Sequence, residues 1–124
     1  MKWQQLADEV ERIGRTPGVI TCTLVDAATG MTCYASGGRP DLEPLAEAAR
    51  DYWRLHLRND NLFNGLGPMV GIIVLHEEGV INVMPCSADF VLVTLARRNT
   101  VNFSSWPTRL QRLRTTLGAI DTPA

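Results

Sequence analysis

The chain has 124 residues, of which 45% are hydrophobic and 20% are charged. This composition is ordinary for a globular protein, and the length is typical of one domain that buries a core without disulfide staples. The formal net charge of −1 provides no overall positive field, so nucleic-acid binding is excluded as the expected function.

The chain begins with a predicted amphipathic helix at residues 3–13. Apolar side chains recur there at the three- and four-residue spacing of one helix face. The segment Thr16-Pro17-Gly18 ends this helix, because proline and glycine interrupt regular structure. The expected core-facing stripe is Trp3, Leu6, Val10 and Ile13.

Two strands follow, indicated by alternating apolar and polar side chains, at residues 20–25 and 31–36. The segment between them is a turn in which Gly30 suits a positive φ. In a hairpin closed at this turn, Cys22 and Cys33 fall on the same face as Leu24 and Met31. We therefore expect both thiols to pack in the core.

A second helix is predicted from Leu42 to about Arg58. Its core-facing stripe consists of Leu42, Leu45, Ala46, Ala49 and Trp53. A second apolar line lies roughly 100° round the helix and consists of Ala48, Tyr52 and Leu55. This helix therefore has more apolar surface than a single sheet face needs.

The second half of the chain indicates a loop, three strands and a last helix. Residues 59–68 are rich in Asn and Gly and predict the loop. Short loops separate the three strands, which must therefore be antiparallel neighbours, at residues 69–76, 80–84 and 90–96. The last helix is expected to begin at Ser105 and to end at Gly118, with Trp106, Leu110, Leu113 and Leu117 directed inward.

The predicted order is α-β-β-α-β-β-β-α, and strands that are apolar on both faces need cover on both faces. We therefore expect an α/β fold of the α+β type. It is a three-layer α/β/α sandwich around a five-stranded antiparallel sheet, with the second helix on one face and the first and third helices on the other. A single domain is expected at residues 1–118, followed by a flexible C-terminal tail at residues 119–124.

The cellular location is inferred from two further features. The first residues, MKWQQLADEV, contain no apolar segment typical of a secretory signal. The longest apolar run, residues 69–75, is far too short to span a bilayer. We therefore expect a cytoplasmic protein without membrane insertion, whose three cysteines are reduced.

Patterns typical of a metal, nucleotide or catalytic site are missing from the sequence. The three cysteines and two histidines do not have the close spacing of zinc ligands. The glycines of residues 64–71 precede a strand, whereas a phosphate-binding loop follows a strand and opens a helix. We expect no metal, no cofactor and no catalytic residue. A small enzyme that uses Cys86 or His76 is one alternative.

Three segments form an ordered pattern. They are Thr16-Pro17-Gly18-Val19 after the first helix, Leu24-Val25-Asp26 followed by Gly30, and the two strands around a short loop at residues 83–93. Together they resemble the Roadblock (dynein light chain) superfamily, and its small bacterial members in particular. The resemblance covers about residues 3–118 and rests on structural patterns rather than on a catalytic signature. The segment Trp106-Pro107 departs from the family pattern at the last helix.

The resemblance implies a profilin-like sheet in the strand order 2-1-5-4-3, with the third strand at an edge. An exposed apolar edge strand favours pairing with another chain. Family members commonly pair this strand with its copy in a second subunit, while their second helices pack together. The expected homodimer interface is therefore Ala48, Tyr52, Leu55, Met69, Val70, Ile72 and Val74.

The resemblance also implies a non-enzymatic, homodimeric scaffold or regulator of a small Ras-like GTPase. A GTPase-activating partner is one form of such a regulator. Arginines on the outside of the second and third helices are the candidate partner-binding residues: Arg50, Arg54, Arg109 and Arg112. The alternative is a small-molecule-sensing domain of the profilin or PAS type, which would need a buried pocket lined by polar groups.

Overall fold

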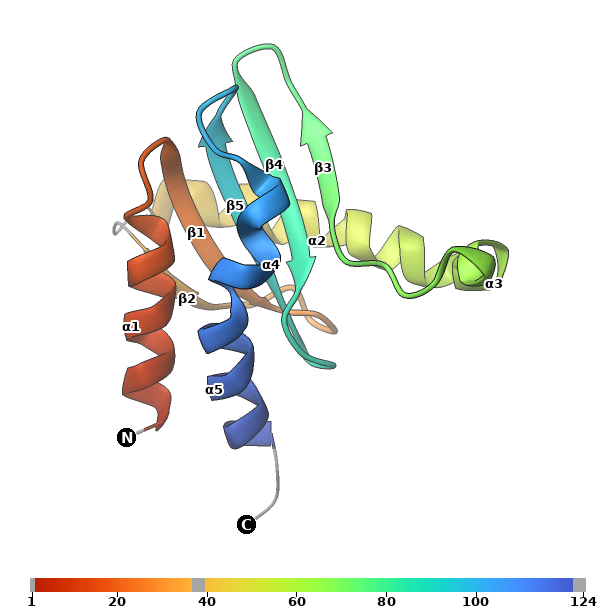
Figure 1. Cartoon of the computed structure of the whole chain (residues 1–124), viewed down its shortest axis with the longest axis horizontal. Helices are drawn as coiled ribbons and strands as arrows, with labels where there is room; N and C mark the ends of the chain where they lie inside the picture. Colours follow the sequence, from red (N-terminus) through yellow and green to blue (C-terminus); the bar gives the residue numbers. More distant parts are fainter. Residues whose placement is uncertain (1, 37–39, 122–124) are drawn as a thin grey trace.

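Five strands form one antiparallel sheet in the order β2-β1-β5-β4-β3, which confirms the expected order (Figure 1). The computed structural model describes residues 2–36 and 40–121. The strands are β1 (Val19–Asp26), β2 (Thr32–Ala35), β3 (Ile72–Leu75), β4 (Gly79–Pro85) and β5 (Phe90–Arg97). The α-helices are α1 (Lys2–Gly14), α2 (Glu43–Arg58), α3 (Asp60–Phe63), α4 (Trp106–Arg109) and α5 (Gln111–Asp121). Three short 3-10 helices complete the structure: η1 (Pro40–Leu42), η2 (Asn64–Leu66) and η3 (Phe103–Ser105).

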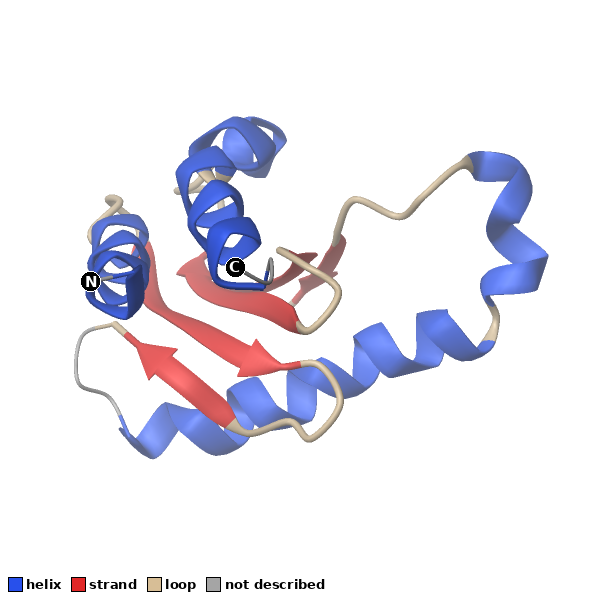
Figure 2. Ribbon diagram, turned by 90° about the horizontal axis from the view of Figure 1, so that it is seen from below, coloured by secondary structure: helices blue, strands red, loops and turns tan. Residues whose placement is uncertain are grey.

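Helices cover both faces of this sheet. α2 runs along one face, and α1 and α5 lie side by side on the other (Figure 2). The three-layer α/β/α sandwich is thus confirmed, because helices pack against both faces of the sheet.

The larger core cluster lies between the sheet and the layer of α1, α4 and α5. Leu6, Val10 and Ile13 of α1 are at most 1% exposed, as their spacing predicts. Trp3 belongs to the same stripe but is 47% exposed, so its expected burial is wrong. It lies in the first turn of α1, one turn before the first buried position. Trp106 and the inward leucines of the last helices, Leu110, Leu113 and Leu117, are fully buried.

The second core cluster lies between α2 and the opposite face of the sheet. Ala46 and Ala49 are each 2% exposed and pack against a surface of strand valines, Val25, Val83, Val91 and Val93. Small side chains on the helix allow its backbone to approach the sheet closely. Leu45 and Trp53 of the predicted core stripe pack at the border of this cluster.

The β1–β2 hairpin contains a bulge that the alternating pattern does not reveal. Leu24 pairs with Tyr34 and Val25 pairs with Thr32, so Cys33 is an extra residue on β2. A bulge of this kind redirects the side chain of the extra residue. Cys33 is therefore exposed, and the expectation that it packs in the core is wrong. Met31, expected on the same apolar face, is 67% exposed.

Three boundaries differ from the predicted ones. β3 begins at Ile72 rather than at residue 69, because the chain at 69–71 does not join the ladder with β4. The last helix is divided into α4 and α5 at Leu110, close to the unusual Pro107. α5 continues through Gly118 to Asp121, so the expected end at Gly118 is wrong, and residues 122–124 lie outside the described residues.

The predicted loop at residues 59–68 is also wrong in its first part. α3 and η2 continue from α2 after a break at Asn59, and only the segment from Gly67 onward is irregular. Figures 1 and 2 both show this stretch extending beyond the β3 edge of the sheet. Residues 55–66, from the end of α2 to the end of η2, are called the arm below. Across residues 2–36 and 40–121, every helix is too short or too polar to cross a membrane.

Candidate interaction surfaces

The outer side of α2 is apolar and exposed, as the second apolar line of this helix predicts. Ala48 is exposed, Tyr52 is 41% exposed and Leu55 is 56% exposed. These side chains lie on the side of α2 that does not contact the sheet. They therefore form a surface that is available to a partner, and their place in a homodimer interface stays a prediction.

Successive side chains of β3 alternate between the two faces of the sheet. Ile72 and Val74 are partly buried and pack against the α2 core cluster. Ile73 and Leu75 point to the opposite face of the sheet and are 54% and 63% exposed. The reason is the period of two along a strand, which a wholly apolar segment does not reveal. Ile72 and Val74 can thus contribute to an interface mainly through their backbone groups.

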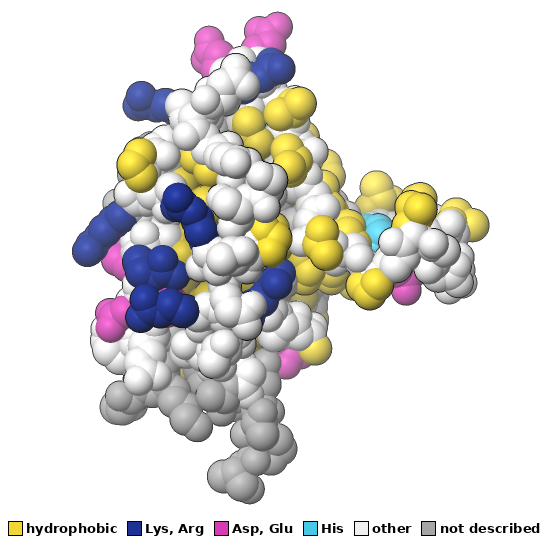
Figure 3. All heavy atoms as spheres, in the orientation of Figure 1, with side chains coloured by type: hydrophobic (Ala, Val, Ile, Leu, Met, Phe, Trp, Pro, Cys, Tyr) yellow, Lys and Arg dark blue, Asp and Glu magenta, His cyan; other side chains and the backbone are white. Residues whose placement is uncertain are grey.

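Residues before β3 add to this apolar edge. Val70 is 67% exposed, and Met69 is partly buried. Neither belongs to the strand, so both would contact a partner through side chains rather than through a ladder of hydrogen bonds. In Figure 3, apolar side chains gather over the β3 side of the molecule and on the arm, whereas basic side chains gather over the helices at the other side.

Arg50, a predicted partner-binding residue, is not free on the surface. Its side chain is only 11% exposed, and Nη1 donates a hydrogen bond of 3.2 Å to the carbonyl oxygen of Ala28 in the β1–β2 turn. Gly30 in that turn has φ +80°, and a Cβ there would lie 2.8 Å from Nη2 of Arg50. The Arg50 guanidinium therefore stabilises the turn.

The β1–β2 turn is further ordered by Asp26. Its Oδ1 accepts hydrogen bonds from the backbone amides of Ala28 and Thr29, each 2.9 Å long. The hydrogen bond from Thr29 lowers the pKa of Asp26 most, and the amide of Ala28 and the charge of Arg50 also lower it. The turn is thus held by its own hydrogen bonds, and the amides of Ala28 and Thr29 are not free to bind an anion.

Arg54 differs from Arg50 although both belong to α2. Its side chain is exposed beside Tyr52 and Leu55, and together with Asp51 and Arg58 they line a shallow pocket of about 430 Å³. Among the residues that the structure describes, no carboxylate forms an ion pair with Arg54. Of the four predicted partner-binding arginines, Arg54 lies directly beside the apolar line of α2.

Arg109 and Arg112 lie on the opposite layer and have local partners. Nη2 of Arg112 is 3.2 Å from Oε1 of Glu9, and the same carboxylate binds Arg12 at 2.8 Å. The guanidinium of Arg109 lies 5.8 Å from the ring centroid of Trp106, and Nη1 donates a hydrogen bond to Thr16. These arginines connect α1 with α4 and α5, which accounts for their positions without a partner protein.

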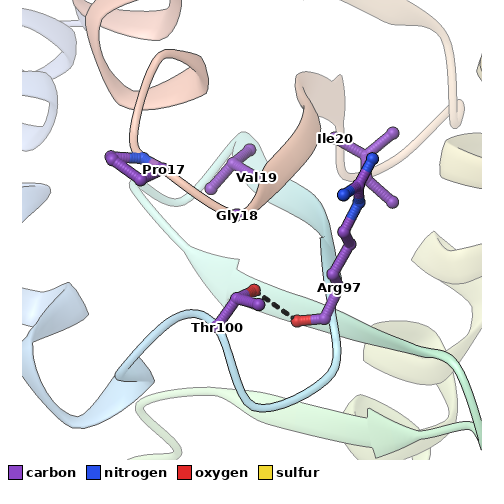
Figure 4. A pocket seen from close by; sticks show the side chains of 6 residues that line it. All are labelled: Pro17, Gly18, Val19, Ile20, Arg97 and Thr100. Atoms are coloured by element: carbon purple, nitrogen blue, oxygen red, sulfur yellow. Dashed lines mark hydrogen bonds between the residues drawn. The ribbon is translucent and has the colours of Figure 1, made fainter.

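A pocket of about 670 Å³ lies where the α1–β1 turn meets the end of β5 (Figure 4). It is lined by Pro17, Gly18, Val19, Ile20, Arg97 and Thr100. The Thr100 hydroxyl donates a hydrogen bond of 2.6 Å to the carbonyl oxygen of Arg97, as the dashed line shows. The pocket is broadly open to solvent, and its lining lacks the nucleophile–base pair that covalent catalysis requires.

Cys22 and Cys86 have the environments of structural cysteines, whereas Cys33 is exposed. Burial raises the pKa of Cys22 and raises that of Cys86 to about 12. Cys86, in the short segment between β4 and β5, is only 8% exposed. Burial also raises the pKa of the exposed Cys33, although to a smaller extent. Within the described ranges, His, Cys, Asp and Glu side chains form no group of three that could hold a metal ion.

The arm contains a feature that the sequence analysis missed. His56 stacks on Phe63, with ring centroids 5.6 Å apart and planes at 12°. His56 also lines a pocket of about 540 Å³, called the elbow pocket, together with Trp53, Leu57, Asp60, Asn64, Gly67, Pro68, Met69 and Pro85. The four-residue spacing of Leu62 and Leu66 was the available signal that this Asn- and Gly-rich segment is helical.

The sequence matches no family model and no curated protein. Its structure is similar to a Roadblock/LC7 domain from Streptomyces avermitilis, with a TM-score of 0.74 and 17% identity over 97% of this chain and 96% of that one. Myxococcus xanthus MglB matches with a TM-score of 0.71 and 14% identity over 95% and 88% of the two chains. A structure of MglB with a tetrameric arrangement has the same TM-score at 16% identity, covering 96% and 89%.

A profilin from Schizosaccharomyces pombe is also similar, with a TM-score of 0.57 and 13% identity over 97% of this chain and 99% of the profilin. The Roadblock resemblance and the profilin-like description of the sheet are therefore both confirmed at the level of the fold. The chain has the Roadblock/LC7 fold.

Proposed function

We propose that this protein is a non-enzymatic, homodimeric scaffold or regulator of a small Ras-like GTPase. The single observation that carries the proposal is the combination of an apolar edge strand, β3, with an exposed apolar line on α2, in a Roadblock/LC7 fold. Regulation of a Ras-like GTPase is the function that the Roadblock resemblance implies. We also propose that the protein acts in the cytoplasm, as expected from the sequence.

The exposed apolar side chains support self-association. A sheet edge with unpaired backbone groups and apolar side chains is a site for strand pairing. Ile73, Leu75 and Val70 surround this edge and are each more than half exposed in the single chain. Tyr52 and Leu55 offer the second contact, on α2. Pairing of β3 with its copy would extend the sheet across two subunits, and the tetrameric arrangement of MglB is an example of self-association in this fold.

Among the four candidate arginines, Arg54 is the better candidate for contact with the GTPase. The Arg50 side chain is held by the β1–β2 turn, and Arg112 lies on the layer opposite α2, where its 74% exposed side chain is 3.2 Å from Glu9. Arg54 is exposed on α2, and interface energy commonly concentrates on arginine anchors of this kind. A dimer would present two copies of Arg54. We favour regulation by reshaping of the GTPase's own loops over donation of an arginine to the transferring phosphate.

The test is a pull-down with a Ras-like GTPase encoded beside this protein's gene, loaded with GDP or with a GTP analogue. Hydrolysis of GTP is then measured with and without the protein. Binding that depends on the nucleotide supports the proposal, and faster hydrolysis would identify an activator rather than a passive scaffold. Arg54→Ala should weaken binding, whereas Arg112→Ala should not.

Binding to no Ras-like protein, together with tight capture of a small metabolite, would overturn the proposal and favour the sensing alternative. The pockets described above are open to solvent, so they do not provide the buried polar site that this alternative needs.

A further inference from the structure

The arm carries the most exposed leucines of the chain at a point that projects from the body. Leu62 is 77% exposed and Leu66 is 85% exposed, and Phe63 beside them is 42% exposed. Apolar side chains clustered in this way mark a contact site rather than ordinary surface. Figure 2 shows that α3 curves away from the sheet, so the body of the same chain does not cover these leucines.

Contacts within the arm hold its helical turns in place, so the fold itself exposes the two leucines. The Asn59 side chain donates a hydrogen bond of 2.8 Å to the carbonyl oxygen of Leu55, at the bend between α2 and α3. His56 stacks on Phe63, and its Nε2 lies 3.9 Å from Oδ1 of Asp60. These contacts fix the direction of α3 relative to α2 before any partner binds.

The inner side of the same bend is hollow. The elbow pocket lies between Trp53 and His56 of α2 on one side and residues 67–69 on the other. Its volume of about 540 Å³ exceeds the size of one leucine side chain, and much of its lining is apolar. The arm therefore combines apolar projections, Leu62 and Leu66, with an apolar recess.

We propose that two copies of this chain interlock through their arms: the leucines of one arm enter the elbow pocket of the second copy, and the reverse contact forms at the same time. A two-fold dimer needs a surface that is complementary to itself, and the arm together with the elbow pocket beside it supplies both halves of the contact. The arm also extends past the β3 edge, the side on which a pairing strand of a second copy would lie. The inference rests on the proposed homodimer and adds the arm to its interface.

The test measures the dimer dissociation constant by sedimentation in a dilution series. The variants are Leu62→Asp and Leu66→Asp, and the matched control is Asn61→Asp, an exposed residue of the same arm that receives the same charge. We expect the dissociation constant to rise about tenfold or more for each leucine variant and to stay within about twofold for the control. Because both leucines are exposed in one chain, circular dichroism should show unchanged folding.

Two further measurements separate this inference from the homodimer itself. A dimer of one unmodified and one Leu66→Asp chain keeps one of the two arm contacts, so its affinity should lie between those of the two homodimers. Ile73→Asp, on β3, should also weaken the dimer. If Ile73→Asp weakens it while both leucine variants dimerise normally, the homodimer stands and the arm contact is wrong. If the unmodified protein is a monomer throughout, the proposed homodimer fails and the arm contact fails with it.

Discussion

Nη1 of Arg50 donates a hydrogen bond of 3.2 Å to the carbonyl oxygen of Ala28, which fastens the middle of α2 to the turn between β1 and β2. This contact separates two arginines that appear equivalent in the sequence. The Arg50 side chain is 11% exposed and connects α2 to the β1–β2 turn, whereas the Arg54 side chain, one turn later, is exposed. The two residues should therefore respond differently to the same substitution.

Arg50→Ala should lower the free energy of unfolding by about 1–3 kcal/mol, because it removes a charged hydrogen bond and the packing of a long side chain. Arg54→Ala should change it by no more than about 0.5 kcal/mol, since this side chain is exposed and unpaired among the described residues. Urea denaturation of both variants checks the difference. Equal destabilisation by the two substitutions would contradict the structural role of Arg50.

The three thiols should differ in reactivity. In the native protein a thiol reagent at mildly alkaline pH should modify Cys33 first, because Cys22 and Cys86 are buried and their pKa values are raised by that burial. Cys22→Ala should cost about 1–2 kcal/mol of stability, and Cys33→Ala no more than about 0.5 kcal/mol. Mass spectrometry after partial labelling identifies the reactive position, and early labelling of Cys22 would contradict the structure.

The free energy of unfolding at acidic pH should depend in part on Asp26. Hydrogen bonds from the turn lower its pKa in the folded chain, so its carboxylate stabilises the fold above the unfolded pKa of about 3.9. That contribution is lost as the pH falls through the lower, folded pKa. Asp26→Asn keeps a side-chain oxygen for the turn but cannot titrate, so its stability should depend less on pH in this range. Urea denaturation at a series of acidic pH values checks this, and an unchanged pH profile would show that the turn does not perturb Asp26.

Much of the fold could be predicted from the sequence because its periodicity is clear. The apolar spacing of α1 and the positions of the strands follow from repeats of 3.6 and 2 residues. Trp3 and Cys33 show where such patterns stop being sufficient. The end of a stripe can extend beyond the surface it covers, and a single bulge residue leaves the ladder and moves off the core face.

The candidate surfaces were predicted less completely, for reasons that are local. A wholly apolar strand has no period, so the sequence could not distinguish the inward Ile72 from the outward Ile73. Arg50 lies on the polar side of α2, but only the position of the β1–β2 turn determines that its guanidinium has a partner. Residues 59–66 of the arm have the Asn- and Gly-rich composition typical of loops, although the tertiary setting and the stack of His56 on Phe63 hold them in helical turns.

The outer side of α2 provides a test of the dimer that does not depend on the arm. Tyr52→Glu would place a charge in the expected contact between two α2 helices, where it loses its hydration without gaining a partner, so the dimer should weaken. The control is Gln111→Glu, which adds a charge to an exposed position of α5 on the other layer. Light scattering of both variants checks the prediction. A dimer equally stable in both would remove α2 from the interface.

The most direct test of the central claim is sedimentation velocity of the unmodified protein mixed with the labelled Ras-like GTPase in its two nucleotide states. The account predicts that the GTPase sediments with a dimer of this protein in one nucleotide state and alone in the other. A GTPase that sediments alone in both states, at concentrations where this protein is fully folded, would contradict the account.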